Sequence, residues 1–270
     1  RDRSVEIVTV TTRGDELEGP LSETGEVGLF TSTLERALLH GSVDVAVHSL
    51  KDLPVADGSA VPVVAVPLRG DPADALVSRS GEPLAGLPAG AKIGTSSPRR
   101  GSMILAQRPD ARVVPIRGNV DGRVRQLDEG HFDAIVLAIA GLSRLGLEDR
   151  VSERFDPRAF PPAPGQGALA VQARSDDTRL HSAVLHLDDP EARSMTSAER
   201  ACLEALGGGC SRPLGVHAWR EGETIGVAAA IGSLDGTKVV RGEAFGSTAE
   251  GAGRAAAEWL LRSGGEELLA

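Results

Sequence analysis

Stretches of apolar and β-branched residues alternate with stretches of helical periodicity through the first two thirds of the chain. This alternation is typical of βαβ units and of mixed or parallel sheets. The apolar runs are continuous, as expected of strands that are covered on both faces. The expected strands are residues 5–11, 43–48, 61–67, 92–96, 111–116, 134–138 and 168–173. The expected helices are residues 33–40, 98–107, 120–129 and 141–145.

The last third of the chain has a different pattern. A helical stretch over residues 191–206 leads into a glycine-rich loop, three alternating runs and a final helix over residues 248–262. The alternating runs cover residues 215–220, 224–231 and 238–244, separated by Glu-Gly and Asp-Gly turns. Such turns between alternating runs are typical of hairpins. This part therefore predicts an α+β module with a small antiparallel sheet.

Two segments rich in proline and glycine, PLRGDP at 67–72 and PPAPGQG at 161–167, flank the middle of the chain. A chain that leaves one α/β domain, builds a second and then returns needs two such crossings. We therefore expect a discontinuous first α/β domain over 1–68 and 168–187. The second α/β domain is expected over 73–161, and the α+β domain over 190–270.

Composition narrows the classes of function. The chain has 38 acidic and 29 basic residues and a net charge of −9, which argues against a nucleic-acid or membrane-surface binder. No apolar run approaches the roughly 20 residues that span a bilayer. Two cysteines are too few for a disulfide framework, so the cytosol is the expected compartment. All but three basic residues are arginines, which bind carboxylates and phosphates in a bidentate way.

The motif HSLKDLP, residues 48–54, places Lys51 and Asp52 directly after an expected strand, and Pro54 prevents a helix from continuing there. Ligands of α/β sheets bind at the carboxyl ends of strands. An adjacent lysine and aspartate can present an ammonium and a carboxylate to one site. The motif is equally compatible with a solvated turn that holds an ordinary salt bridge.

The motif GTSSPRR, residues 94–100, predicts a helix start with Ser97 as N-cap and Pro98 at the first helical position. Arg99 and Arg100 then lie in the first turn, where cations oppose the helix dipole. We expect an external anion that bridges these arginines to the free backbone N–H groups. The alternative is a plain helix start with exposed arginines.

The motif RGNVDGRV, residues 117–124, repeats this arrangement at the next junction of strand and helix. Asn119 is a candidate N-cap, with Arg117 before the helix and Arg123 in its first turns. Two such junctions would form an anion pocket that faces a cleft. A ligand with several carboxylates or phosphates would suit it.

The two cysteines have different settings. Cys202 lies within an expected helix, where a free cysteine is usually a small buried apolar residue. Cys210 follows three glycines in GGGCSRPLG, so it is a candidate nucleophile or covalent attachment point. Neither cysteine pairs nor histidines have metal-ligand spacing, so no metal site is expected. Glycine-rich nucleotide cradles and a nucleophile elbow are also absent from the sequence.

Taken together, these motifs resemble the hydroxymethylbilane synthase, or porphobilinogen deaminase, family. The resemblance covers DVAVHSLKDLP, GTSSPRR, IRGNVDGRV, FDAIVLAIAGLSRLGL, PAPGQGALA and ERACLEALGGGCSRPLG, in the family's order. It implies an α/β fold of two hinged domains like those of periplasmic binding proteins, plus a smaller α+β C-terminal domain. It also implies a cytoplasmic, monomeric transferase that condenses four porphobilinogen molecules into hydroxymethylbilane.

The resemblance further implies a dipyrromethane cofactor joined to Cys210 through a thioether, and Asp52 as the catalytic carboxylate. The cofactor contacts that it implies are Ser49, Lys51, Thr95, Ser97, Arg99, Arg100, Arg117 and Arg123. The substrate contacts that it implies are Phe30, Arg144 and Gln166. The growing chain carries two carboxylates per ring, which is the kind of ligand that an arginine pocket suits.

The chain departs from the family pattern at two places. The usual opening strand with its RIGTRxSxLA-like segment is not in the sequence, so we expect the first domain to lack that strand. In the expected lid loop, Val27 and Ser32 stand where lysines are common. The competing interpretations are a non-catalytic anion-binding protein and a ligand-sensing regulatory domain. The first does not explain a cysteine at the end of a glycine-rich loop, and the sequence shows no DNA-binding helix-turn-helix segment for the second.

Overall fold

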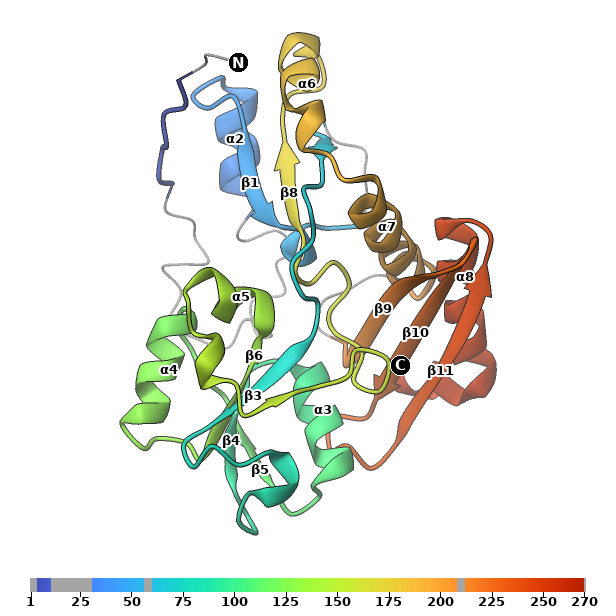
Figure 1. Cartoon of the computed structure of the whole chain (residues 1–270). Coiled ribbons are helices and arrows are strands. Elements are labelled where there is room, and N and C mark those ends of the chain that lie inside the picture. The colour runs from blue at the N-terminus through green and yellow to red at the C-terminus, as the bar shows by residue number, and fades with distance from the viewer. Residues whose placement is uncertain (1–3, 11–30, 56–59, 208–211, 270) are drawn as a thin grey trace.

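The computed structural model describes residues 4–10, 31–55, 60–207 and 212–269, and the described strands form three sheets (Figure 1). The first sheet has the order β1-β8-β2 and is antiparallel throughout. Its strands are β1 (Ala46–Ser49), β8 (Leu169–Gln172) and β2 (Val63–Ala65), and helix α2 (Ser32–Leu39) packs on β1. Strand β8 therefore brings the chain back beside residues from its first quarter.

Two expectations for this first sheet were wrong. Strand β1 is shorter than residues 43–48, and only every second residue is buried, because one face of the strand is open to solvent, with Val47 59% exposed. Residues 4–10 form no strand, and Val5 and Ile7 are 86% and 89% exposed. An extended segment becomes a strand only when a neighbour supplies hydrogen-bond partners, and no described strand pairs with this one.

The second sheet has the order β5-β4-β6-β3-β7. Its strands are β3 (Asp74–Ser78), β4 (Lys92–Gly94), β5 (Arg112–Val114), β6 (Ala134–Ala138) and β7 (Glu153–Arg154). Pairs β4–β5 and β4–β6 are parallel, whereas β3 is antiparallel to β6 and β7, so the sheet is mixed as expected. The helices of this part are α3 (Pro98–Gln107), α4 (Val120–Asp128) and α5 (Ile139–Arg144).

The third sheet is antiparallel and has the order β11-β10-β9. Its strands are β9 (Leu214–Glu221), β10 (Thr224–Gly232) and β11 (Val239–Gly246). Helices α7 (Pro190–Ala205) and α8 (Ala249–Leu260) pack against it and share its apolar core. Strand β10 also contacts α3, because Ala230 joins the core of the second sheet. The α+β module predicted for the last third is therefore confirmed.

Short helical elements connect these parts. They are η2 (Leu50–Asp52), η3 (Leu84–Gly86), η4 (Glu148–Arg150), α6 (Thr178–Val184), η5 (Leu185–Leu187), η6 (Leu261–Gly265) and η7 (Glu266–Leu268). Within the described ranges, no helix combines the length and the apolar character that crossing a membrane requires.

The two crossing segments between the first and second sheets run side by side (Figure 1). The backbone N–H of Gly70 donates to the carbonyl of Gly167 at 3.2 Å, and Arg69 Nε donates to the carbonyl of Gln166 at 2.9 Å. Gly167 has φ +87°, and a Cβ there would stand 2.7 Å from the Gly70 carbonyl oxygen. Only glycine suits this close approach of two backbones.

Candidate active site

Lys51 and Asp52 lie at the carboxyl end of β1, as the sequence predicted, on the single turn η2. The Leu50 N–H donates to the Ala168 carbonyl at 3.0 Å, which fixes this turn against the second crossing segment. Ser49 precedes the turn as its N-cap residue and is exposed. The motif HSLKDLP therefore presents two charged side chains where the first sheet meets the crossings.

The start of α3 also follows the sequence prediction. Ser97 is the N-cap, and its Oγ accepts the N–H of Arg100, while Pro98 occupies the first helical position. The Thr95 hydroxyl accepts the N–H of Ser97 at 3.2 Å and thereby shapes the entry to the helix. These contacts set the direction in which the first turn projects Arg99.

Arg99 and Arg100 are buried, with 4% and 7% of their surface exposed. Their partner is Asp74 on β3: Arg99 Nη1 lies 2.6 Å from Asp74 Oδ2, and Arg100 Nη2 lies 2.6 Å from Asp74 Oδ1. Burial alone would raise the pKa of Asp74, but the guanidinium groups of Arg100 and Arg99 hold it well below its usual range. One internal carboxylate thus pairs with both guanidinium groups and offsets one of their two positive charges. The alternative of a plain helix start with exposed arginines was therefore wrong, and the external anion stays a prediction.

Gln166, from the second crossing, connects this buried ion cluster to Lys51. Its Nε2 donates to Asp74 Oδ1 at 2.8 Å, and its Oε1 accepts from Lys51 Nζ at 3.4 Å. The same Oε1 accepts from Arg100 Nη2 at 3.3 Å. Side chains from η2, β3 and α3 thus meet at the amide that the crossing provides.

Burial and neighbouring charges shift the titration of the pair on η2. Burial, together with the Arg100 guanidinium, lowers the pKa of Lys51 to about 8. Burial raises the pKa of Asp52, against the opposing effect of the Lys51 ammonium. Asp52 is exposed to solvent, yet many protein atoms lie near its carboxylate and partly desolvate it. A carboxylate that is partly desolvated interacts more strongly with a nearby cation than one in bulk water.

A group of like charges lies beside the buried cluster. Asn119 caps α4 as predicted by accepting the N–H of Gly122, and Arg123 follows in the first turn of that helix. Burial and the guanidinium groups of Arg100 and Arg117 all lower the pKa of Arg123. The arrangement of three neighbouring arginines is suited to an anionic ligand that relieves this repulsion.

Arg144, at the end of α5, is exposed and donates to the carbonyl of Gly167 at 3.0 Å. This contact places it at the second crossing, next to Gln166. Two other predicted residues, Phe30 and Cys210, lie outside the described residues. The structure therefore brings Lys51, Arg99, Arg100 and Gln166 into one network, with the other predicted arginines around it.

Two acidic residues that the sequence analysis missed organise this region. Asp74 opens a strand that was not predicted, although the short apolar run after Pro72 is compatible with one. Glu199 is fully buried in α7 and holds the Arg69 guanidinium in two contacts of 2.8 and 2.9 Å. It also accepts the N–H groups of Gly165 and Ala218. Glu199 thus ties α7 and β9, the elements that flank Cys210 in sequence, to both crossings.

The start of β9 packs directly on Arg99. The Val216 N–H donates to the Pro162 carbonyl at 2.8 Å, so β9 adheres to the second crossing. A Cβ at Gly215 would stand 2.0 Å from the Pro161 carbonyl oxygen and 3.0 Å from Cδ of Arg99. Glycine is required there for the third sheet to approach Arg99. The chain that follows Cys210 therefore enters the third sheet beside Arg99.

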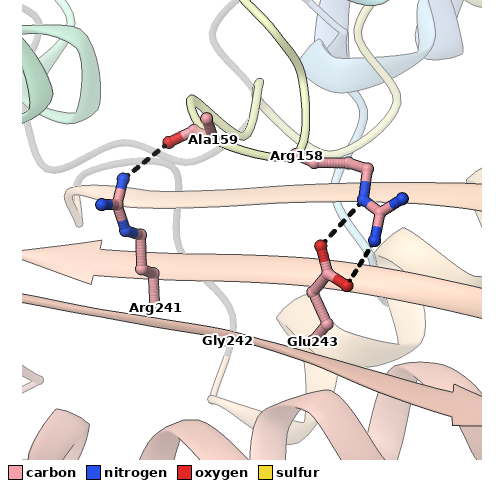
Figure 2. A pocket seen from close by; sticks show the side chains of 5 residues that line it. All are labelled: Arg158, Ala159, Arg241, Gly242 and Glu243. Atoms are coloured by element: carbon pink, nitrogen blue, oxygen red, sulfur yellow. Dashed lines mark hydrogen bonds and ion pairs between the residues drawn. The ribbon is translucent and has the colours of Figure 1, made fainter.

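A separate cavity of about 250 Å³ lies between the 158–159 segment and strand β11 (Figure 2). It is lined by Arg158, Ala159, Arg241, Gly242 and Glu243. Arg158 pairs with Glu243, and Arg241 donates to the Ala159 carbonyl, as Figure 2 shows. None of the site residues predicted from the sequence lines this cavity.

Comparison with protein families gives two matches. Residues 1–182 match "Porphobilinogen deaminase, dipyromethane cofactor binding domain", and residues 194–262 match "Porphobilinogen deaminase, C-terminal domain". Among curated relatives, the porphobilinogen deaminase of Roseiflexus castenholzii is 47% identical over 99% of this chain and 89% of its own length. The porphobilinogen deaminase of Xanthomonas campestris is 45% identical over 98% of this chain and 88% of its own length.

Solved structures give more distant likenesses. The periplasmic VFT2 domain of BvgS from Bordetella pertussis is 18% identical, with a TM-score of 0.36 over 57% of this chain and 64% of that one. The aliphatic sulphonate binding protein SsuA from Escherichia coli is 17% identical, with a TM-score of 0.38 over 64% of this chain and 57% of that one. The family relationship rests on the sequence matches.

Proposed function

The chain belongs to the porphobilinogen deaminase family, and we propose that the side chains gathered around Lys51 and Asp52 are its catalytic site. Its activity is that of a hydroxymethylbilane synthase of tetrapyrrole biosynthesis, which condenses four porphobilinogen molecules head to tail with loss of ammonia. The observation that supports this location is the meeting of Lys51 and Arg100 at Gln166.

The charges of this region fit the family's dipyrromethane cofactor. Each of its pyrrole rings carries two carboxylates, and such charges would offset the mutual repulsion of Arg100, Arg117 and Arg123. A bidentate charge-assisted contact to a carboxylate contributes about 1.5–3 kcal/mol. When bound, the dipyrromethane supplies the pyrrole carbon to which the first substrate is added.

We propose the following roles for the predicted residues. Those that hold the cofactor are Cys210, Ser49, Lys51, Thr95, Ser97, Arg99, Arg100, Arg117 and Arg123. Those that contact incoming substrate are Phe30, Arg144 and Gln166. Because Asp74 already pairs with Arg99 and Arg100, we propose that these two arginines have fixed side chains and supply positive charge to the base of the site. The side chains of Arg117 and Arg123 are less buried, so we propose that they adjust their conformation to the ligand.

Asp52 is the proposed catalytic residue. Loss of ammonia from porphobilinogen leaves a cation, and a fixed carboxylate stabilises that charge as it develops. The same carboxylate can accept the proton that leaves the attacked pyrrole carbon. Lys51, whose pKa is lowered to about 8, lies beside it and is positioned to bind a carboxylate of the cofactor. Asp52 works in its ionised form, so turnover is expected to fall as the pH drops through its raised pKa.

The choice of attachment point follows from the two cysteines of the chain. Cys202 is fully buried, and burial together with the charge of Glu199 raises the pKa of its thiol to about 12. A thiol in that state supplies almost no thiolate, which is the form that forms a thioether. Cys210 is the remaining candidate.

Replacing Cys210 by alanine should therefore yield a protein without the pyrrole adduct and without turnover. Intact-mass measurement and the red colour with Ehrlich's reagent report the adduct, and ammonia release reports turnover. Cys202→Ala is the matched control and should keep both. An adduct that survives in Cys210→Ala would reject the attachment point, whereas a wild-type protein without adduct or turnover would reject the function and favour a non-catalytic anion-binding protein.

We further propose that the three sheets mark three domains and that the enzyme acts as a cytosolic monomer. The proposal on compartment and oligomeric state rests on composition and on the family resemblance alone. Size-exclusion chromatography with light scattering tests the monomer, and a dimeric mass would reject it.

A further inference from the structure

His48 is a buried titratable residue that the proposed mechanism does not use. It lies on β1 facing the interior with 8% of its surface exposed, whereas its neighbour Val47 is 59% exposed. In the register of β1 and β8, His48 pairs with Ala170 and Ala46 pairs with Gln172. His48 and Gln172 therefore share one face of the sheet as diagonal neighbours (Figure 1 shows β1 beside β8).

Within the described ranges, two complementary polar atoms on this face are placed too far from any partner for a hydrogen bond. They are Nε2 of His48 and Oε1 of Gln172, both buried. Gln172 Nε2 donates to the carbonyl of Val61 at 2.9 Å, which fixes the amide so that its oxygen remains as an acceptor. Leaving both atoms unsatisfied would cost free energy. A small movement of the two side chains toward each other would satisfy both atoms. Nε2 of His48 would then carry a proton and donate it in a hydrogen bond to Oε1 of Gln172.

His48 is also electrostatically coupled to Asp52, four residues further along the same segment. Burial lowers the pKa of His48, while the Gln172 side chain and the Asp52 charge raise it. In return, the imidazolium charge of His48 opposes the rise that burial causes in the pKa of Asp52. The groups that act on the imidazole are thus Asp52 from η2 and the uncharged amide of Gln172 from β8, while Lys51 acts on Asp52 from the other side.

We propose that His48 is a positioning residue for Asp52: held by Gln172, its imidazolium form stabilises the Asp52 carboxylate and keeps the site charged under mildly acidic conditions. The inference rests on the proposed function, in which Asp52 is the catalytic carboxylate. The enzyme would stay active over a wider pH range, because His48 and Asp52 titrate as a coupled pair rather than singly.

The pH profile of kcat tests this proposal. His48→Gln keeps a side chain that can donate to Gln172 but cannot become a cation, so the pKa of Asp52 should rise. The acidic limb of the profile should then move to higher pH by about half a unit, which is about a threefold loss of kcat on that limb. Gln172→Met, which removes the acceptor without adding charge, should produce a smaller shift in the same direction.

His40→Gln is the matched control, because it is the same substitution at a histidine outside the site. His40 is exposed at the C-cap of α2. Its profile should coincide with that of the wild type. NMR titration of His48 gives an independent measurement: its pKa should fall in Asp52→Asn, because the Asp52 charge that raises it is gone.

The outcomes distinguish the role of His48 from the enzyme function. The role of His48 is overturned, while the enzyme function stands, if the acidic limb of the kcat profile does not shift in His48→Gln. It is likewise overturned if the pKa of His48 is the same in Asp52→Asn as in the wild type. A wild-type protein that releases no ammonia from porphobilinogen overturns the function itself. Because the NMR titration needs no turnover, it still tests the coupling if one variant folds poorly.

Discussion

Replacing Asp52 by asparagine is expected to lower kcat for porphobilinogen about 100-fold or more, while the protein still carries its dipyrromethane. The substitution keeps the shape of the side chain and removes its charge. A charge aimed at a developing cation is worth several kcal/mol, and general acid–base catalysis typically contributes about 100- to 10,000-fold. Cofactor attachment should persist because the arginines that hold it are unchanged.

Steady-state assays and intact mass, run on one preparation, check this result together. Asp44→Asn is the matched control, because Asp44 is an exposed carboxylate on the same segment whose partner is Arg174. It should retain near-normal turnover. A near-normal rate in Asp52→Asn would remove Asp52 from the mechanism, and loss of the adduct in that variant would make it a cofactor residue instead.

Replacing Asp74 by asparagine is expected to destabilise the fold by about 3–5 kcal/mol, the usual cost of removing one partner from a buried ion cluster. The guanidinium groups of Arg99 and Arg100 would remain buried with no carboxylate between them. Gln166 would lose a hydrogen bond to Asp74 as well. We expect the variant to bind less dipyrromethane, because Arg99 and Arg100 then repel each other and no longer hold their positions in the site.

Denaturant unfolding measures the loss, and intact mass measures the cofactor content. Asp128→Asn is the control: it breaks an exposed ion pair with Arg150, and such pairs contribute little. A stability for Asp74→Asn that matches the control would show that the arginines find other partners. In that case their buried charge could not be the organising feature of the site.

The sequence predicted the local structure of the site well where the chemistry is local. Helix starts depend on a few neighbouring residues, so Ser97, Pro98 and Asn119 identified the beginnings of α3 and α4. The position of Lys51 and Asp52 after a strand followed from one apolar run and one proline. These features need no knowledge of the rest of the fold.

What the sequence could not show are the partners that lie far away along the chain. Asp74 reaches Arg99 and Arg100 only because β3 inserts between β6 and β7 in the second sheet. Because this strand pairing is not visible in the sequence, the sequence pattern indicated only an external anion as partner of the arginines in the first turn of α3. The segment over residues 4–10 is the opposite case, since its apolar pattern predicts a strand for which the described structure provides no neighbour.

The central claim is that the pyrrole chain lies between Asp52 and the arginines of α3 and α4. A crystal structure of the protein purified with its adduct tests this most directly. We expect density continuous with Sγ of Cys210, with carboxylates in contact with Arg117 or Arg123 and pyrrole N–H groups in contact with Asp52. An adduct seated instead in the cavity of Figure 2, against Arg158 and Arg241, would contradict it.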